Sequence, residues 1–315
     1  MLELAIQSIT LIVSLVVLAS ASHFAIKYIE DLIELTGLSE ASMGFAVLSV
    51  MTSVPEITVA IFSVLQGTPG ISVGDIMGSN VFNIGVVVGI LAAGGFLKKC
   101  STSLLTELVD ILFLSSLIPL LLIIFKVASP FVGVVLILIF VFSIYKMTKK
   151  RNEATSNNRK TLVQNKSRTI MVVAKIIVGI ATVILAARFV VTSASNIAIL
   201  AGMPPIVVGA KIIAIGTSLP ELTLDLTAVR RGRVHLAIGD AIGSNLTNIT
   251  LVLGIVLLSS PFTVDITILT EIIPFVLVTT IILWRFLTKG GVSQIGGITL
   301  LLIYIVFQAT LQVQA

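Results

Sequence analysis

Long apolar runs restrict the fold of this chain more than any other feature of its sequence. The segments 128–147 and 237–259, for example, each contain a single charged residue. A helix needs about 20 mostly apolar residues to cross a bilayer. Only 11% of the 315 residues are charged and 57% are hydrophobic, whereas about 25% of the residues in a soluble domain are charged. We therefore predict an all-α integral membrane protein.

The hydropathy pattern predicts ten transmembrane helices joined mostly by short loops. Their approximate ranges are 4–29, 41–65, 72–97, 104–123, 128–147, 169–198, 203–229, 237–259, 265–286 and 292–312. The loop at 148–168 is longer, polar and basic. We predict that it separates two five-helix units, residues 1–147 and 169–315.

The basic residues predict how the chain is oriented, because Lys and Arg favour cytoplasmic loops. With the N-terminus outside, most of the Lys and Arg residues, including those of the 148–168 loop, fall on the inner side. We predict extracellular termini, a cytoplasmic central loop and a location in the cell membrane. The net charge is +5, but the basic residues lie beside apolar spans. The predicted partners are therefore the lipid bilayer and inorganic cations rather than nucleic acid.

The two halves of the sequence are similar when one is shifted by 165 residues. Thr52–Glu56 then aligns with Thr217–Glu221, and Gly74–Ile84 aligns with Gly239–Ile249. Five spans is an odd number, so two such units in one chain insert in opposite orientations. Inverted repeats are typical of secondary transporters, whose site lies near the midplane between the repeats.

Glu56 and Glu221 lie deep within apolar sequence. A carboxylate in a membrane is costly unless it is paired or coordinated, so such residues are functional by default. Thr52 and Ser53 precede Glu56 by about one turn and share its helical face. Pro55 removes a backbone donor and interrupts the helix. The second repeat carries the same arrangement, which predicts a paired site.

Ser79 and Asn83 are spaced by four residues on one helical face, as are Ser244 and Asn248. The broken second, third, seventh and eighth helices would therefore surround the midplane with carboxylate, hydroxyl, amide and carbonyl oxygens. Calcium takes six to eight oxygen ligands of these kinds, and sodium suits the same set. Soft and imidazole ligands are absent from these motifs, which argues against zinc and copper.

Several other classes of protein have no support in the sequence. Cys100 is a single cysteine and His23 and His235 are the two histidines, which excludes an intramolecular disulfide and a zinc site rich in histidine. Nucleotide-binding and metalloprotease motifs are also missing. We predict no enzymatic activity, no cofactor and no obligate protein partner.

The paired motifs resemble those of the calcium/cation antiporter superfamily, and in particular prokaryotic sodium/calcium exchangers. The second repeat carries Gly-Thr-Ser-Leu-Pro-Glu, and both repeats carry Gly-Ser-Asn-x-x-Asn. The resemblance implies alternating access, in which the first and sixth spans slide past the rest. It implies that the ion ligands are Glu56 and Glu221, surrounded by Thr52, Ser53, Ser79, Asn83, Thr217, Ser218, Ser244 and Asn248, with the carbonyls of Ser49 and Ala214 as sodium ligands.

The sequence departs from this family pattern at three acidic or amide positions. Asn248 stands where sodium/calcium exchangers commonly carry an aspartate. Asp75 and Asp240 stand where asparagine is common. We expect these two aspartates near opposite mouths of the repeats, as accessory residues that attract cations or cap helices.

Three further ionisable residues have open roles. Asp225 follows Glu221 by four residues, and its counterpart in the first repeat is Ala60. It either contributes an ion ligand or pairs with Arg230. His23 and Arg188 are counterparts in the first and sixth spans, where Arg188 is expected to extend toward the membrane surface and a histidine can confer pH sensitivity.

The predicted function is antiport of calcium against sodium through one site. Calcium/proton exchange is the alternative, because buried glutamates can take up protons and Asn248 leaves the site one acid poorer. A cation channel is a less favoured alternative, since inverted repeats with buried acids are typical of transporters.

Overall fold

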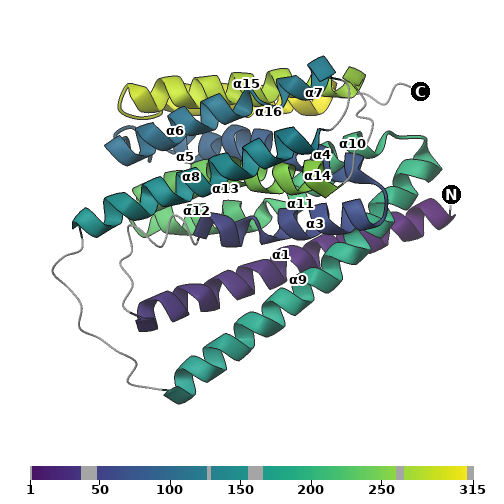
Figure 1. Cartoon of the computed structure of the whole chain (residues 1–315), viewed down its shortest axis with the longest axis horizontal. Coiled ribbons are helices and arrows are strands. Elements are labelled where there is room, and N and C mark those ends of the chain that lie inside the picture. Colours follow the sequence, from purple (N-terminus) through teal and green to yellow (C-terminus); the bar gives the residue numbers. More distant parts are fainter. Residues whose placement is uncertain (1, 37–47, 126–128, 155–165, 260–265, 311–315) are drawn as a thin grey trace.

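The computed structural model describes residues 2–36, 48–125, 129–154, 166–259 and 266–310. Within these ranges the chain forms helices and short connections, and the helices lie in one bundle (Figure 1). Seven helices in this part are long and apolar enough to cross a membrane, and Val54–Leu65, Pro130–Lys146 and Gln294–Thr310 are shorter apolar helices. The prediction of an all-α membrane protein is confirmed.

The first half of the chain contains one long helix followed by shorter ones. Its helices are α1 (Leu2–Thr36), α3 (Val54–Leu65), α4 (Pro69–Phe82), the π-helix η1 (Asn83–Val88), α5 (Gly89–Ala93), α6 (Ser103–Ser116), α7 (Leu120–Phe125) and α8 (Pro130–Ala154). Residues 48–52 are also helical and precede α3. Residues 41–47 of the predicted second span lie outside the described residues.

The second half also begins with one long helix that is followed by shorter ones. Its helices are α9 (Lys166–Ala201), α10 (Pro205–Val208), the π-helix η2 (Gly209–Ile213), α11 (Ala214–Thr217), α12 (Leu219–Arg230), α13 (Val234–Thr247), the π-helix η3 (Asn248–Val252), α14 (Leu253–Ser259), α15 (Ile266–Thr288) and α16 (Gln294–Thr310).

Several helices are longer than the predicted spans. Helix α8 continues to Ala154 and α9 begins at Lys166, so both enter the predicted 148–168 loop. Helix α1 continues to Thr36. Hydropathy marks only the part of a helix that lies in lipid, and Lys, Arg and Glu sustain a helix in water. Residues 155–165 of the predicted loop lie outside the described residues.

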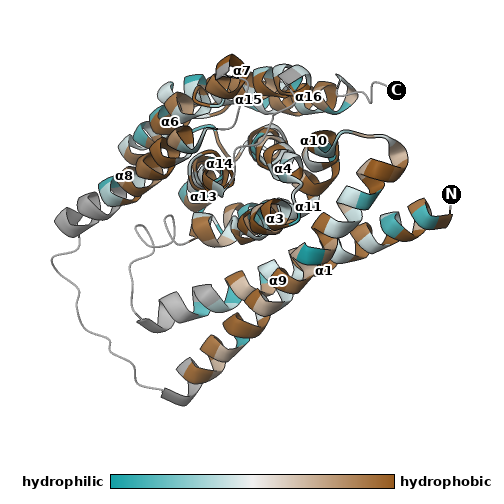
Figure 2. Ribbon diagram, turned by 45° about the vertical axis from the view of Figure 1, so that its right-hand side comes forward, coloured by the Kyte–Doolittle hydropathy of each residue, from teal (hydrophilic) through white to brown (hydrophobic). Residues whose placement is uncertain are grey.

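Helices α1 and α9 lie side by side along one side of the bundle (Figures 1 and 2). Their buried contacts form an apolar cluster that includes Leu11, Leu18, Val190 and Ala194. A larger cluster, which includes residues of α4, α5, α13 and α15, fills the rest of the bundle. The cluster of the α1–α9 pair also includes Val59 of α3 and Ile71 of α4, so the pair packs on the remaining helices through aliphatic side chains.

Helices α4 and α13 form the centre of the molecule. Every residue from Ile71 to Phe82 and from Ala237 to Thr247 is buried. Both helices are rich in Gly, Ser and Asn, which are unfavourable in water-exposed helices. In a membrane the backbone must satisfy its own hydrogen bonds, so these sequences still form helices. The polar side chains of the repeated motifs are consequently held inside the bundle.

Glycines allow α4 to approach the α10–η2–α11 segment of the other half at backbone distance. A Cβ atom on Gly74 would lie 2.0 Å from the carbonyl oxygen of Ile206, and one on Gly209 would lie 2.2 Å from that of Ile71. Small residues commonly permit such contacts between membrane helices. This packing places the polar face of α4 beside Thr217.

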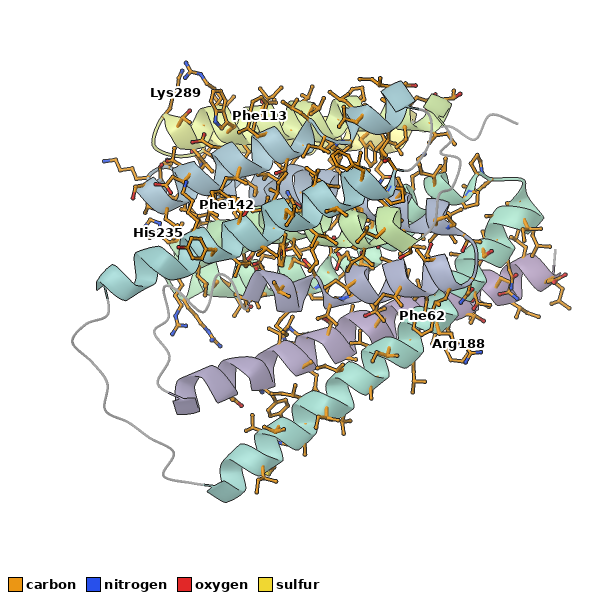
Figure 3. The ribbon with its side chains drawn as sticks, viewed as in Figure 1. Phe62, Phe113, Phe142, Arg188, His235 and Lys289 are labelled. Atoms are coloured by element: carbon orange, nitrogen blue, oxygen red, sulfur yellow. The ribbon has the colours of Figure 1, made fainter. Side chains whose placement is uncertain are left out.

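The start of α1 and the end of α16 lie at the opposite end of the bundle from His235 and Lys289 (Figures 1 and 3). Helix α1 begins and α16 ends at the same end (Figure 1). His235, at the start of α13, and Lys289, after α15, lie at the other end (Figure 3).

We expect Gly74→Ala to lower the free energy of unfolding by about 1–3 kcal/mol or more, since the added methyl group would overlap the backbone of α10. Gly70→Ala is the matched control one turn earlier on α4, because its Cβ would lie 3.7 Å from its nearest neighbour. Thermal unfolding of purified protein in detergent measures both. Equal midpoints for the two variants would contradict the close packing of α4 against α10.

Candidate functional site

The helices that carry the two glutamates are both interrupted three residues before the carboxylate. The helix preceding α3 breaks at Ser53 (φ −78°, ψ 4°) and the one preceding α12 breaks at Ser218 (φ −90°, ψ 4°). Pro55 and Pro220 then fall in the first turn of the new helices, where the missing N–H is not needed. The predicted breaks in the second and seventh helices are therefore present, with matching backbone conformations.

The prediction that the third and eighth helices are also broken was wrong, because each continues through a π-helical segment without unwinding. Helix α4 passes into the π-helix η1 at Asn83, and α13 passes into the π-helix η3 at Asn248. Short π-helices are rare and occur frequently at functional sites. Sequence reasoning placed both asparagines in the site but missed the π geometry, for which the sequence offers no local signal beyond the repeated asparagine itself.

Hydroxyl groups of each half contact the central helix of the other half. Thr52 Oγ1 lies 2.8 Å from Ser244 Oγ and 3.4 Å from Asp240 Oδ1. Thr217 Oγ1 lies 3.3 Å from Ser79 Oγ and donates to Asp75 Oδ1 at 2.9 Å. Each of these residues has its counterpart 165 positions away in the corresponding contact. The two halves therefore make matching contacts with each other, through Thr52 with Ser244 and through Thr217 with Ser79.

Glu56 and Glu221 are fully buried and close enough to interact electrostatically. Ser218 Oγ donates to Glu56 Oε1 at 3.4 Å. The other carboxylate oxygen of Glu56 and both carboxylate oxygens of Glu221 have no hydrogen-bond partner. The two glutamates thus present unused acceptor oxygens inside the protein.

The remaining predicted ligands are buried nearby on the same helices. The side-chain amides of Asn83 and Asn248 are buried and have no hydrogen-bond partner. The Ser49 carbonyl accepts from Ser53 Oγ at 2.9 Å and from Thr52 Oγ1 at 3.2 Å. The Ala214 carbonyl accepts from Ser218 N at 3.3 Å. Both carbonyls are therefore occupied within their own helices.

The expectation that Asp75 and Asp240 lie near the mouths was wrong. Both are fully buried, and both interact with the central hydroxyl groups. A residue that lies one helical turn before Ser79 is still inside the molecule, because other helices surround α4 and α13 along most of their length. The two aspartates thus belong to the central cluster.

Asp225 is also fully buried, and its side chain interacts with that of Asp240. Arg230 is exposed and forms no ion pair with it, so the predicted alternative of an Asp225–Arg230 pair is not present. His23 and Arg188 are exposed, and Arg188 projects from α9 away from the bundle (Figure 3). Neither of these two residues reaches the centre.

The balance of charge in this cluster is unusual. Five carboxylic acids are 0% exposed: Glu56, Asp75, Glu221, Asp225 and Asp240. The one ion pair between two described residues, Lys146 with Glu107 at 3.3 Å, lies elsewhere. No three Asp, Glu, His or Cys side chains of the described residues converge as a ready-made metal site. A cation held here would therefore take hydroxyl, amide or carbonyl oxygens in addition to carboxylates.

A helical membrane protein with broken helices around buried acids belongs to the general class of ion transporters. A family model described as sodium/calcium exchanger protein matches residues 6–149 and 171–312. The chain belongs to this family, and so to the calcium/cation antiporter superfamily, as its motifs predicted.

Relatives and solved structures agree with this assignment. The sodium/calcium exchanger MaX1 of Methanosarcina acetivorans is 31% identical over 87 residues, which is 28% of this chain and 25% of the relative. The match therefore spans about a quarter of that relative's length. Membrane protein MJ0091 of Methanocaldococcus jannaschii is 27% identical over 282 residues, which cover 87% of this chain and 88% of the relative. Inner membrane protein YrbG of Escherichia coli is 28% identical over 73% of this chain and 72% of the relative.

The fold resembles solved structures of the sodium-calcium exchanger NCX_Mj. The form soaked with 2.5 mM Na+ and 1 mM Sr2+ has a TM-score of 0.70 at 24% identity, with 97% of this chain and 98% of that chain covered. The form soaked with 100 mM Na+ and 10 mM Sr2+ has a TM-score of 0.69 at 24% identity, with 98% and 99% covered. At this identity the likeness establishes the fold.

We expect Thr217→Val to lower the free energy of unfolding by about 1–3 kcal/mol, because it removes a hydrogen-bond donor from the buried carboxylate of Asp75. Thr223→Val on the following helix, α12, is the control, since Thr223 is exposed and its hydroxyl donates only to the carbonyl of Leu219. Thermal unfolding without added divalent cations compares the two. A loss of stability at Thr223 equal to that at Thr217 would contradict the assigned contact.

Proposed function

We propose that this protein is a secondary antiporter that exchanges calcium for sodium through the buried acid cluster. The observation that carries the proposal is that Glu56, Asp75, Glu221 and Asp225 are fully buried without a basic partner among the described residues, beside hydroxyl groups of both halves. Burying a charge without compensation is very costly. A bound cation is the compensation that this family of proteins supplies.

The proposed ligands are oxygen atoms of the repeated motifs. Glu56 and Glu221 are the central ligands, with Thr52, Ser53, Ser79, Asn83, Thr217, Ser218, Ser244 and Asn248 around them. Ser49 and Ala214 supply carbonyl oxygens to sodium when the hydroxyl and amide donors that now occupy them share or release those carbonyls. No cofactor, catalytic step or obligate protein partner forms part of this mechanism.

Shared ligands couple the two ion fluxes. Two glutamates can neutralise one calcium ion, or can receive sodium ions in its place. An empty site would leave its carboxylates uncompensated in a medium of low dielectric constant, which disfavours the step that moves the site across the membrane. The occupied site moves more readily, and the protein therefore exchanges ions and does not carry one kind alone.

We further propose ten transmembrane helices arranged as two inverted repeats, residues 1–147 and 169–315. The corresponding hydrogen bonds of Thr52 and Thr217 support this arrangement. So does the contact between two counterparts, in which Asn245 Nδ2 donates to the Asn80 carbonyl at 3.4 Å. Residues related by a two-fold axis meet each other only where they lie close to that axis.

Alternating access would arise from sliding of the α1–α9 pair past the other helices. Two observations support this motion. The pair packs on α3, α4 and α10 through a purely aliphatic cluster that is separate from the main core, and Leu15 of α1 lies against Gly216 in the segment that leads to Glu221. A shift of α1 would therefore change the contacts of the site directly.

The proposed orientation places the termini outside the cell and the basic central loop in the cytoplasm. The start of α1 and the end of α16 lie at one end of the bundle (Figure 1), and Lys289 lies at the other end (Figure 3). This arrangement supports the orientation, because basic residues favour the cytoplasmic side. The proposed location is the cell membrane.

Calcium/proton exchange is the second candidate function. Asn83 and Asn248 are both neutral amides in the two repeats, so the site lacks the aspartate that is common in sodium/calcium exchangers. Protons could then replace sodium on the glutamates. A cation channel remains a third and weaker alternative.

In proteoliposomes, we expect an outward sodium gradient to drive uptake of radioactive calcium, and an outward proton gradient to drive little. Glu56→Gln and Glu221→Gln should each abolish uptake, because one of the two central charges is lost. Glu271→Gln is the matched control, since Glu271 is a partly exposed acid on α15 outside the cluster.

Three outcomes would change the account. Uptake driven only by protons would replace sodium/calcium exchange with calcium/proton exchange. Calcium flux that needs no counter-ion and does not saturate would favour a channel. Equal loss of uptake in Glu271→Gln would show that the glutamate effects are not specific to the cluster.

A further inference from the structure

A cavity of 410 Å³ lies between α1, the end of α12 and the start of α13. Its apolar lining residues are Ile26, Leu224, Ala228 and Leu236, and its polar ones are His23, Lys27, Asp31, Thr223, Thr227, Arg231 and Arg233. A water molecule occupies about 30 Å³ in the liquid, so the cavity has room for a hydrated cation. It adjoins the start of α13, at the end of the bundle that carries His235 and Lys289 (Figure 3). We call this end the basic end.

An aliphatic layer lies between this cavity and the buried acids. Ile26, Leu48 and Leu224 are buried against one another, and Leu236 packs beside them. Three of these four residues also line the cavity. The cavity therefore ends at the aliphatic layer, which we define as Ile26, Leu48, Leu224 and Leu236.

The aliphatic layer adjoins the site along three helices. Residues that are three or four positions apart are neighbours on a helix surface. Three layer residues stand in this relation to residues of the site, namely Leu48 to Thr52, Leu224 to Glu221 and Leu236 to Asp240. The fourth residue, Ile26, belongs to α1. One layer of side chains thus separates the cavity from the site.

The other end of the site is closed by the counterparts of the same residues, 165 positions away. The counterparts of Ile26, Leu48, Leu224 and Leu236 are Val191, Ile213, Val59 and Ile71. All four counterparts are 0% exposed and belong to the larger aliphatic cluster around α1 and α9. Phe62 packs on this cluster, at the position where the cavity has Thr227. Related residues therefore close both ends of the site, but the closure at the basic end is thinner.

Polar residues at the two ends differ in a way that matches this inequality. Thr192 Oγ1 of α9, which also donates to the Arg188 carbonyl, lies 3.3 Å from Oε1 of Gln66 at the end of α3. The counterparts of Thr192 and Gln66 are Lys27 and Arg231, which both line the cavity. Like charges repel, although salt weakens the effect at a surface. A contact that joins two helices at one end is thus replaced by repulsion at the basic end, which Asp31 in the cavity lining offsets in part.

We propose that the cavity is the vestibule through which ions reach the site from the basic end. The aliphatic layer is its gate, and the Thr192–Gln66 contact helps to hold the opposite end closed. The inference rests on the proposed function, because it assigns a route to the cation that the site carries. An aliphatic constriction excludes water and hydrated ions until it widens. Since Ile26 belongs to α1, sliding of α1 moves one wall of the gate.

Reaction of introduced cysteines with a methanethiosulfonate that carries a trimethylammonium group tests this route, because the reagent is itself a cation. The experiment uses the purified full chain in detergent. The native Cys100 is buried, so the unsubstituted chain gives the background. We expect Leu224→Cys, at the floor of the cavity, to react at least about tenfold faster than its buried counterpart Val59→Cys. In proteoliposomes, modification of Leu224→Cys should then stop calcium uptake.

A second set of variants tests the contact at the opposite end. Adding Thr192→Val to Val59→Cys should raise its reaction rate about two- to tenfold, the range expected for the loss of one hydrogen bond. Thr182→Val is the matched control on α9, because the Thr182 hydroxyl donates only to the Val178 carbonyl. Equal rates with Thr192→Val and Thr182→Val would overturn the role of the Thr192–Gln66 contact.

Two outcomes would overturn the vestibule. One is a reaction of Leu224→Cys that is no faster than that of Val59→Cys, and the other is modified Leu224→Cys that still takes up calcium. Thermal unfolding shows whether each variant is folded, and Ala228→Cys, which also lines the cavity, replaces Leu224→Cys if that variant does not fold. The reaction rates need no ion flux. Failure of the proposed function would instead appear as absence of sodium-driven calcium uptake by the unmodified wild type.

Discussion

Buried carboxylates that lack a basic partner govern how this molecule is built. Glu56, Asp75, Glu221 and Asp225 are fully buried, and none of them pairs with a Lys or Arg of the described residues. Such a cluster persists only where its charge is neutralised, by a bound cation or by protons. Broken helices, π-helices and close glycine contacts all bring oxygen atoms toward the same centre. Their common effect is a polar interior that a cation can enter.

The two halves cooperate because each completes the other's site. Thr52 contacts Ser244 across the interface, and Thr217 contacts Ser79 in the corresponding way. Close packing at Gly74 and Gly209 holds the central helices in register. The symmetry is incomplete at Asp225, where the first half has Ala60. A site that is symmetric in its hydroxyl groups and unequal in its acids would hold cations differently at its two sides.

Much of this arrangement could be predicted from the sequence, because apolar length and repeated polar motifs are local signals. They gave the helical membrane fold, the breaks near Pro55 and Pro220 and the family. The burial of Asp75 and Asp240 was missed, since depth depends on which neighbours surround α4 and α13. The Asp225–Asp240 contact was missed for the same reason, because it depends on the register of α12 against α13. The ion-binding roles of the individual residues remain predictions.

Anomalous diffraction from crystals soaked in strontium, a heavier substitute for calcium, would test most directly whether a cation occupies the acid cluster. The account predicts an anomalous peak between Glu56 and Glu221, within bonding distance of their free carboxylate oxygens, which weakens when sodium is added. Crystals in which the cluster holds no strontium at any sodium concentration, while the carboxylates stay buried, would contradict it.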